Sequence, residues 1–185
     1  MTARRPLLEA LVSLLSPSDV VVSCLGGNSR YLPHLAVPVP VFALCDSMGA
    51  AIPLALGMAL ERPDRNVVAL EGDGSLLMCP NVLATVAACR PANLTALLWV
   101  NGHYESSGGQ SLPSAPVDWP ALAKGFGIAH VERVGDVAGL RQAFPRARDA
   151  REPALLVVDV AFDPSEPIPP YSERPDEIRA RFKIA

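Results

Sequence analysis

The sequence has few aromatic side chains and little net charge. Aromatic residues make up 5% of the 185 positions, and the formal net charge at pH 7 is −3. Since half of all residues are nevertheless apolar, the core must be aliphatic and rich in alanine, and a disordered chain is excluded. The small net charge gives no reason to expect nucleic acid or a membrane surface as a partner.

Long apolar runs are also missing. No run reaches the roughly 20 apolar residues that a membrane-spanning helix needs. Arg4 and Arg5 precede an apolar segment, as in a signal peptide, but Glu9 interrupts that segment. We therefore favour an amphipathic helix over residues 4–15 and expect a cytoplasmic location without a membrane.

Paired cysteines are absent as well. No two of the four cysteines form a CxxC motif, and all four lie among apolar residues: Cys24, Cys45, Cys79 and Cys89. We interpret them as small core residues. Their spacing indicates neither a disulfide framework nor a zinc site.

What the sequence does contain is an alternation of apolar strands and helices. Strands are predicted over residues 19–24, 41–44, 66–71, 93–100, 128–134 and 154–160, and helices over residues 4–15, 49–60, 77–89, 119–125 and 136–149. This alternation predicts an α/β fold: a doubly wound parallel sheet of about six strands with helices on both faces. We assign residues 1–162 to a single domain and residues 163–185 to a proline-rich, charged tail that ends in a helix.

A short polar run supplies the strongest chemical signal, and it reads Glu71-Gly72-Asp73-Gly74-Ser75. It lies between a predicted strand and a predicted helix, at the edge of a parallel sheet where α/β proteins bind ligands. Glycines on both sides of Asp73 permit a tight turn and the close approach of a ligand. The carboxylate of Asp73 is a hard oxygen ligand, which suits Mg²⁺.

A second signal follows the next strand. Residues 93–100 end at Asn101, so Asp73 and Asn101 emerge side by side if the two strands are parallel neighbours. Mg²⁺ keeps few protein ligands and takes further oxygens from water and phosphates. The N-terminal amides of the following helix would add an anion site, and metal and amides together would seat a diphosphate.

The spacing of Gly72-Asp73-Gly74 and Asn101 resembles the signature of thiamine diphosphate enzymes. Two further runs make residues 40–160 resemble the cofactor-binding half of sulfopyruvate and phosphonopyruvate decarboxylases: Asp46-Ser47-Met48-Gly49-Ala50-Ala51 and Asn101-Gly102-His103-Tyr104-Glu105-Ser106-Ser107-Gly108-Gly109-Gln110. The resemblance implies thiamine diphosphate and Mg²⁺ as cofactors and a small 2-oxo acid as substrate.

The resemblance also implies roles for single residues. Asp73 and Asn101 would bind Mg²⁺ through side-chain oxygens, and His103 through its backbone carbonyl. The residues implied in cofactor binding are Asp46, Ser47, Met48, Gly72, Asp73, Gly74, Ser75, Asn101, His103 and Tyr104. Gly74 and Ser75 would offer amides, and the Ser75 hydroxyl would be a further donor.

Four positions differ in how far the resemblance explains them. Met48 would push between the two rings of the cofactor, and the Asp46 carbonyl would accept a hydrogen bond from the aminopyrimidine, although relatives usually have glycine at that position. The His103 side chain is the catalytic candidate, as a substrate contact or proton shuttle. Glu105 stands where relatives commonly have glycine, and nothing in the sequence explains it.

One catalytic group has no counterpart in the sequence. Relatives carry an activating glutamate on a separate pyrimidine-binding domain, and 185 residues provide for one domain only. The resemblance therefore implies a half-enzyme, like the β subunit of sulfopyruvate decarboxylase. A separate α subunit would supply the glutamate in an α₂β₂-type or higher heteromer, and the chain alone would be inactive.

Other interpretations stay open at this point. A carboligase would use the same cofactor site, and a non-catalytic scaffold would keep only the fold. A nucleotide-binding module would need a G-x-G-x-x-G turn after the first strand, which residues 24–29 do not match. Residues 101–117 form a long glycine-containing loop, which we expect to close over the cofactor.

Overall fold

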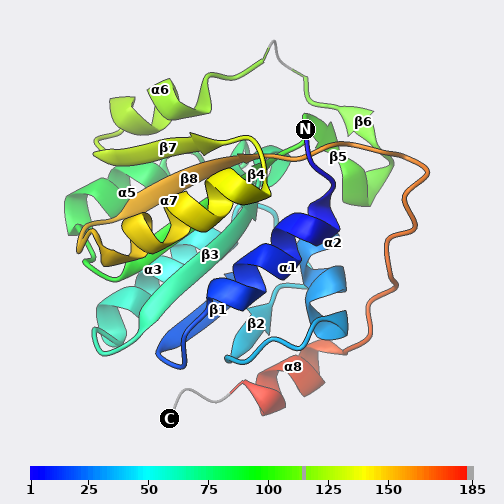
Figure 1. Ribbon diagram of the computed structural model, residues 1–185, viewed down its shortest axis with the longest axis horizontal. Coiled ribbons are helices and arrows are strands. Elements are labelled where there is room, and N and C mark those ends of the chain that lie inside the picture. Colours follow the sequence, from blue (N-terminus) through cyan, green and yellow to red (C-terminus); the bar gives the residue numbers. More distant parts are fainter. Residues whose placement is uncertain (114–115, 183–185) are drawn as a thin grey trace.

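The computed structural model describes residues 1–113 and 116–182 and is built around a six-stranded sheet (Figure 1). The strand order is β2-β1-β3-β4-β8-β7, and every neighbouring pair is parallel. The strands are β1 (Asp19–Ser23), β2 (Val41–Ala43), β3 (Asn66–Gly72), β4 (Leu94–Val100), β7 (His130–Val134) and β8 (Ala154–Asp159). The predicted parallel sheet of about six strands is confirmed.

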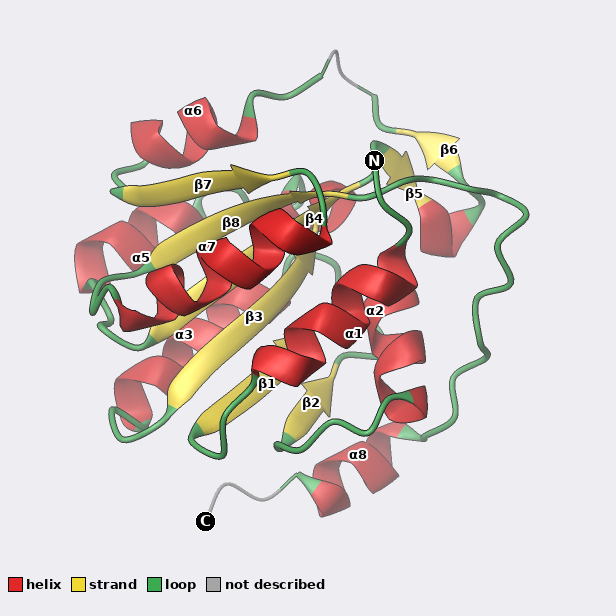
Figure 2. Cartoon of the chain, viewed as in Figure 1, coloured by secondary structure: helices red, strands yellow, loops and turns green. Residues whose placement is uncertain are grey.

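Helices cover both faces of the sheet (Figure 2). On one face lie α1 (Arg4–Leu14) and α7 (Val137–Asp149), and on the other lie α3 (Ala51–Glu61), α5 (Val82–Cys89) and α6 (Trp119–Gly125). The central strands are apolar on both sides, because each of their faces packs against helices. The α/β fold class predicted from the alternation is therefore confirmed.

The strand order creates the crevice in which ligands of such sheets bind. From β1 the chain passes to β2 on one side of it, and then to β3 on its other side. The two connections diverge at the carboxyl ends of β1 and β3, which is the topological switch point of the sheet. The polar run predicted to bind a ligand follows β3 at this point.

Two local predictions need correction. The helix expected over residues 77–89 is wrong in its first turn, because α4 (Asp73–Leu76) begins at Asp73 itself and α5 begins only at Val82. Pro80 has no N–H and disfavours a helical conformation in the residue before it, so the helix is interrupted there. The strand expected from residue 128 begins at residue 130.

The long loop predicted over residues 101–117 contains a small hairpin. Its parts are β5 (His103–Tyr104), the 3₁₀ turn η2 (Glu105–Ser107) and β6 (Gln110–Ser111), with β5 and β6 antiparallel. Residues 114–115 of this loop lie outside the described residues. Before the sheet's second strand, α2 (Gly27–Tyr31) and η1 (Leu32–His34) follow β1 directly.

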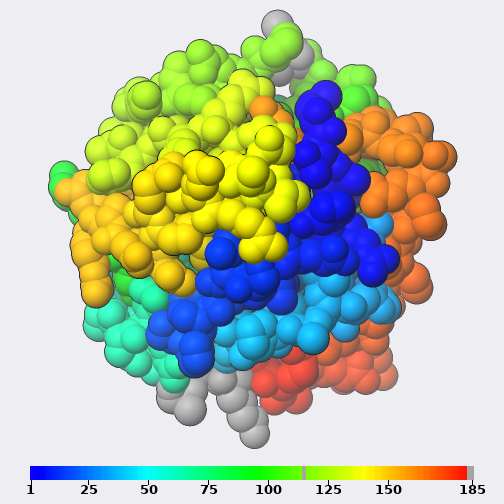
Figure 3. Space-filling view, in the orientation of Figure 1, coloured from blue at the N-terminus to red at the C-terminus, as the bar shows by residue number. Residues whose placement is uncertain are grey.

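The C-terminal tail packs against the rest of the fold. Its expected helix is present as α8 (Pro175–Arg181), whose Ile178 side chain is 3% exposed. Farther back along the tail, the Tyr171 hydroxyl accepts a hydrogen bond from the Gly26 N–H at 2.8 Å. In Figure 3 the tail, orange to red, lies against the light-blue segment that follows β1.

The cysteines agree with their predicted role only in part. Cys24 is buried and Cys89 is exposed, so the interpretation of all four as core residues is wrong for Cys89, which ends α5 near solvent. All four are free thiols. Within the residues that the structure describes, no helix has the length and apolar character to cross a membrane.

Replacing Phe144 with alanine should destabilise the protein strongly. Phe144 in α7 is fully buried between α1 and the sheet. We expect Phe144→Ala to lower the free energy of unfolding, measured in urea, by about 3–5 kcal/mol. Leu60→Ala is the control, because Leu60 is 52% exposed and its loss should change stability by about 0.5 kcal/mol or less. Equal effects of both changes would contradict the layered core.

Candidate functional site

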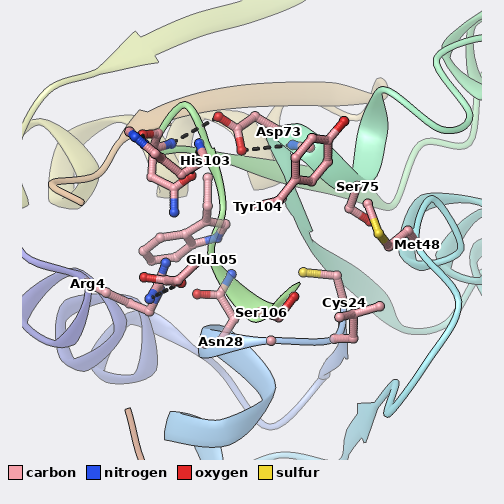
Figure 4. A pocket seen from close by; sticks show the side chains of 17 residues that line it. Arg4, Cys24, Asn28, Met48, Asp73, Ser75, His103, Tyr104, Glu105 and Ser106 are labelled. Carbon is pink, nitrogen blue, oxygen red and sulfur yellow. Dashed lines mark hydrogen bonds and ion pairs between the residues drawn. The ribbon is translucent and has the colours of Figure 1, made fainter. Parts of the chain in front are cut away.

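A cavity lined by both polar and apolar residues opens at the carboxyl ends of β1, β3 and β4 (Figure 4). Its volume is about 60 Å³. Of the ten residues predicted to bind a cofactor, eight line it: Met48, Gly72, Asp73, Gly74, Ser75, Asn101, His103 and Tyr104. Asp46 and Ser47 are exposed and do not line this cavity.

Asp73 is the most constrained acidic group of the cavity. Its side chain is 2% exposed, and one carboxylate oxygen, Oδ1, accepts the Gly74 N–H at 2.8 Å. The other, Oδ2, accepts the N–H groups of Asn101 at 3.0 Å and Gly102 at 2.7 Å. The carboxylate therefore ties the turn after β3 to the end of β4, as expected for adjacent parallel strands. Burial raises its pKa above the ordinary range, and the three amides oppose that shift.

Asn101 and His103 hold each other in place. The Asn101 side-chain oxygen accepts the His103 N–H at 2.9 Å, and His103 Nδ1 lies 2.8 Å from the Asn101 carbonyl oxygen. Since a carbonyl only accepts, Nδ1 carries the proton in this contact, and Nε2 lies 3.5 Å from the Ser111 hydroxyl oxygen. The ring stacks on Phe162, with 3.9 Å between centroids. The side chain therefore has a fixed tautomer and orientation.

Glu71 organises the opposite side of the turn. It is fully buried, and its Oε2 accepts the N–H groups of Ala51 at 3.2 Å and Ile52 at 3.3 Å, at the start of α3. Burial raises the pKa of Glu71, and hydrogen bonds from the Ser75 hydroxyl and these amides oppose the rise. The sequence alone indicated no role for Glu71. The signal in the sequence that could have indicated a role is a carboxylate that directly follows the apolar residues 67–70.

Ser75 is less free than the sequence suggests. Its hydroxyl oxygen accepts the Gly49 N–H at 2.7 Å, and the hydroxyl also bonds Glu71. The hydroxyl is therefore committed to holding the segment around Met48 rather than facing a ligand. The Gly74 amide is likewise committed, to Asp73.

The Met48 segment turns sharply into the cavity. Ser47 has φ 69° and Gly49 has φ 78°, both in the left-handed region. A Cβ at Gly49 would lie 2.9 Å from the Cys79 Cβ, so glycine is required there for space as well as for backbone conformation. Figure 4 shows Met48 beside Ser75 at the rim of the cavity.

The structure adds lining residues that sequence reasoning missed. They come from α1, from the turn after β1, from the end of β4 and from η2: Arg4, Cys24, Leu25, Gly26, Gly27, Asn28, Trp99, Glu105 and Ser106. The turn had a usable signal, because a glycine-containing polar run follows an apolar strand there, as it does after β3. Arg4 gave none, since its contacts lie far away in the sequence.

Unsatisfied polar atoms gather at this cavity. In the described part of the chain, three buried side-chain atoms lack a hydrogen-bond partner: Arg4 Nε, Asn28 Oδ1 and Trp99 Nε1. All three residues line the cavity. Buried orphan atoms are rare in native proteins and indicate a missing polar ligand or water. The site is therefore built for polar contents.

The ligand set suits a hard cation and an anion. Among the described residues, no group of three or more His, Cys, Asp or Glu side chains could hold a metal ion. A cation beside Asp73 and Asn101 would therefore complete its coordination with oxygens from a ligand and water, as Mg²⁺ does at phosphates. Asp73, Asn101 and the glycine turns fit a metal-bound diphosphate.

The fold and this cavity define a class: an α/β cofactor-binding domain with its site at the switch point of a parallel sheet. A family model described as "Thiamine pyrophosphate enzyme, C-terminal TPP binding domain" matches residues 34–158. The chain belongs to this family, which confirms the resemblance. Arg4 and the turn after β1 lie outside the matched range.

Within this family, the chain is similar in sequence to two kinds of decarboxylase. The chain is 37% identical to phosphonopyruvate decarboxylase of Streptomyces hygroscopicus over 95% of its own length and 44% of the relative. It is 35% identical to sulfopyruvate decarboxylase subunit beta of Methanothermobacter thermautotrophicus, over 77% of this chain and 76% of that subunit. The chain thus spans less than half of the phosphonopyruvate decarboxylase but most of the beta subunit.

Solved structures share the fold. A 2-oxoglutarate:ferredoxin oxidoreductase from Magnetococcus marinus superposes with a TM-score of 0.71 at 19% identity, over 88% of this chain and 62% of the other. At 19% identity this structural similarity supports the fold alone, and it agrees with a doubly wound parallel sheet.

Filling the space above Gly74 should disturb the site. An added Cβ would lie 2.6 Å from Tyr104 Cε1 and 3.0 Å from Leu112 Cδ2, so Gly74→Ala must displace the Tyr104 ring. We expect a loss of about 1–3 kcal/mol in the free energy of unfolding, measured in urea. Gly57→Ala in α3 meets nothing within 4 Å and should instead stabilise by about 0.5–1 kcal/mol. Opposite signs are the expected result, and stabilisation by both changes would contradict the contact.

Buried Glu71 should make stability fall as pH rises. Because its pKa is raised in the folded protein, the folded state keeps this proton to a higher pH than the unfolded chain does. The contribution of Glu71 to the free energy of unfolding is fully present below its pKa in the unfolded chain, about 4.3. This contribution is lost as the pH rises through its pKa in the folded protein. Glu71→Gln should remove the part of the decline in the free energy of unfolding that is due to Glu71, measured by urea unfolding from about pH 4 upward. A smaller decline should remain, because the pKa of Asp73 is also raised.

Asp64 provides a control of opposite sign for the Glu71 experiment. A hydrogen bond from the Arg62 side chain lowers the pKa of this exposed carboxyl to about 2. Asp64→Asn should therefore change the slope of the profile only below about pH 4, so for this variant the measurement is extended down to about pH 2. A Glu71→Gln profile parallel to that of the wild type would show that the buried carboxyl does not titrate as expected.

Proposed function

We propose that this chain is the thiamine diphosphate- and Mg²⁺-binding subunit of a heteromeric 2-oxo acid decarboxylase of the sulfopyruvate or phosphonopyruvate type. The observation that carries the proposal is the joining of Asp73 and Asn101 at adjacent strand ends of a glycine-lined cavity. Membership of the thiamine pyrophosphate family and the names of the relatives support it.

The cavity offers groups for each part of the cofactor. Asp73 and Asn101 would hold Mg²⁺ through side-chain oxygens, with the His103 carbonyl as a third ligand. The Ser75 amide at the start of α4 and the turn at Gly26 would face the diphosphate. When bound, thiamine diphosphate supplies the electron sink for loss of CO₂ from a 2-oxo acid.

Other residues would position the organic part. Met48, held over the cavity rim by the Gly49–Ser75 hydrogen bond, would support the folded cofactor. Asp46 and Ser47 do not line this cavity, so their proposed contacts rest on the resemblance alone. His103 stays the catalytic candidate, because its Nδ1 contact fixes the ring while Nε2 makes only a 3.5 Å contact, to the Ser111 hydroxyl.

We further propose that a separate pyrimidine-binding subunit supplies the activating glutamate. Relatives named as beta subunits of sulfopyruvate decarboxylase support a partner. Glu71 is unsuited to the role, since it is sealed against the start of α3. An α₂β₂-type or higher heteromer, active only when assembled and located in the cytoplasm, is the arrangement we expect.

Two alternatives have distinct signatures. A carboligase would yield a new carbon–carbon bond when an aldehyde is added, so product analysis with and without aldehyde separates it from a decarboxylase. A non-catalytic scaffold would bind no cofactor even with its partner. The buried, amide-held Asp73 argues against a scaffold, because burying a carboxylate is unfavourable without a use for it.

The decisive measurement is calorimetric titration of the purified chain with thiamine diphosphate and Mg²⁺, alone and with the product of a neighbouring gene for a pyrimidine-binding domain. We expect binding that needs Mg²⁺ and tightens with the partner. Asp73→Ala should weaken it by roughly 100-fold or more, because a direct metal ligand is lost.

Asp64→Ala is the matched control for that titration, since it removes an exposed aspartate that does not line the cavity. Its affinity should equal that of the wild type. Absence of binding under every condition, or equal binding by Asp73→Ala, would refute the cofactor assignment.

A further inference from the structure

An ion pair joins the first helix to the loop over the cavity. Arg4 Nη1 in α1 lies 2.7 Å from Glu105 Oε2 in η2, and the two side chains are 6% and 13% exposed. Both residues line the cavity, where Figure 4 shows them side by side. A buried pair of this kind is fixed more firmly than an exposed one, because water competes little for its charges.

Gly27 makes room for the guanidinium. A Cβ on Gly27 would lie 2.6 Å from Arg4 Cζ and 2.9 Å from Arg4 Nε. Gly27 is not among the residues with positive φ, so the backbone alone does not require glycine there. The requirement is space for Arg4, which places the arginine directly over the turn that follows β1.

The neighbours of Glu105 contact both glycine turns of the site. An added Cβ on Gly74 would lie 2.6 Å from the Tyr104 ring, and one on Gly26 would lie 3.4 Å from Ser106 Cβ. Residues 104–106 are thus the wall that faces the turn after β1 and the turn after β3. Glu105, the central residue of that wall, is the one that Arg4 holds.

The pair also decides the charge of the cavity. Among the described lining residues, Asp73 and Glu105 are acidic and Arg4 is the one lysine or arginine. A diphosphate would meet the Glu105 carboxylate as an unneutralised charge if Arg4 were absent. Removing one partner of a buried pair is strongly unfavourable, because the other charge stays buried and unpaired.

We propose that Arg4 and Glu105 are positioning residues of the cofactor site. Their ion pair fixes residues 104–106 against the two glycine turns and cancels the Glu105 charge beside the diphosphate. The inference rests on the proposed function and adds to it two residues that act through the cavity wall. It also accounts for the glutamate at position 105, which the sequence left unexplained.

The test compares Arg4→Gln, Glu105→Gln and the double variant in calorimetric titration with thiamine diphosphate and Mg²⁺. We expect dissociation constants raised roughly 10–100-fold in Arg4→Gln and about tenfold in Glu105→Gln. The double variant should be no worse than Arg4→Gln, because it leaves no unpaired charge. Arg5→Gln is the matched control: Arg5 pairs with Glu9 on the exposed face of α1, and its loss should change affinity by about twofold or less.

A second control separates positioning from general stability. Val86→Ala in α5 lowers the melting temperature from the sheet face opposite α1 and should leave the dissociation constant unchanged, because Val86 does not line the cavity. The inference fails if the affinity falls in proportion to the melting temperature in both this control and the Arg4 variant. The ion pair would then be merely structural. Should Arg4→Gln not fold, Arg4→Lys and Glu105→Gln make the same comparison.

Hydrogen exchange tests the inference without cofactor. The Gly109 N–H bonds the Tyr104 carbonyl at 3.0 Å, and the Leu112 N–H bonds the Gly102 carbonyl at 2.9 Å. Both amides should exchange at least about tenfold faster in Arg4→Gln and Glu105→Gln than in the wild type or Arg5→Gln. Unchanged exchange would overturn the inference whatever the cofactor does.

The outcomes distinguish the two proposals. If the wild type binds no cofactor, the proposed function fails, and exchange at Gly109 and Leu112 still decides whether the pair holds the wall. If the wild type binds and both single variants bind equally well, the inference alone fails. Tighter binding by Glu105→Gln, or strictly additive losses in the double variant, would also overturn it.

Discussion

The buried carboxylate of Asp73 is the interaction on which the site depends. It accepts N–H groups from Gly74, Asn101 and Gly102, so one side chain joins the turn after β3 to the end of β4. These amides offset only part of the cost of burying the charge, and the raised pKa reflects the remainder. A cation beside Asp73 would add the positive charge that the amides do not supply, so the metal and the carboxylate would stabilise each other.

A second carboxylate, Glu71, anchors the other side of the same turn. It holds the start of α3, and through Ser75 it also holds the segment that brings Met48 to the cavity. Two acidic residues separated by one glycine therefore fix three elements: β4 through Asp73, and α3 and the Met48 segment through Glu71. The glycine between them lets the backbone change direction without a side chain in the cavity.

The fold and the centre of the site were predictable from sequence, while the far walls were not. The central strands are continuous apolar runs, and β3 and β4 follow each other directly, so Asp73 and Asn101 had to meet if the sheet was parallel. The break before α5 depended on Pro80, which a count of apolar residues passes over. The contact of Arg4 with Glu105 spans more than half of the chain and follows no local pattern, so only the assembled fold reveals it.

The acidic groups near the cavity are all committed to contacts within the fold. Each carboxylate near it is already committed: Asp73 to backbone amides, Glu71 to the start of α3, and Glu105 to an arginine. A group that takes and returns protons must keep a free face toward its ligand. His103 Nε2 makes only a long contact, 3.5 Å to the Ser111 hydroxyl oxygen, and its ring is held by Phe162. In the function that we propose, the cavity would hold an anion and a metal, and a second subunit would supply the activating carboxylate.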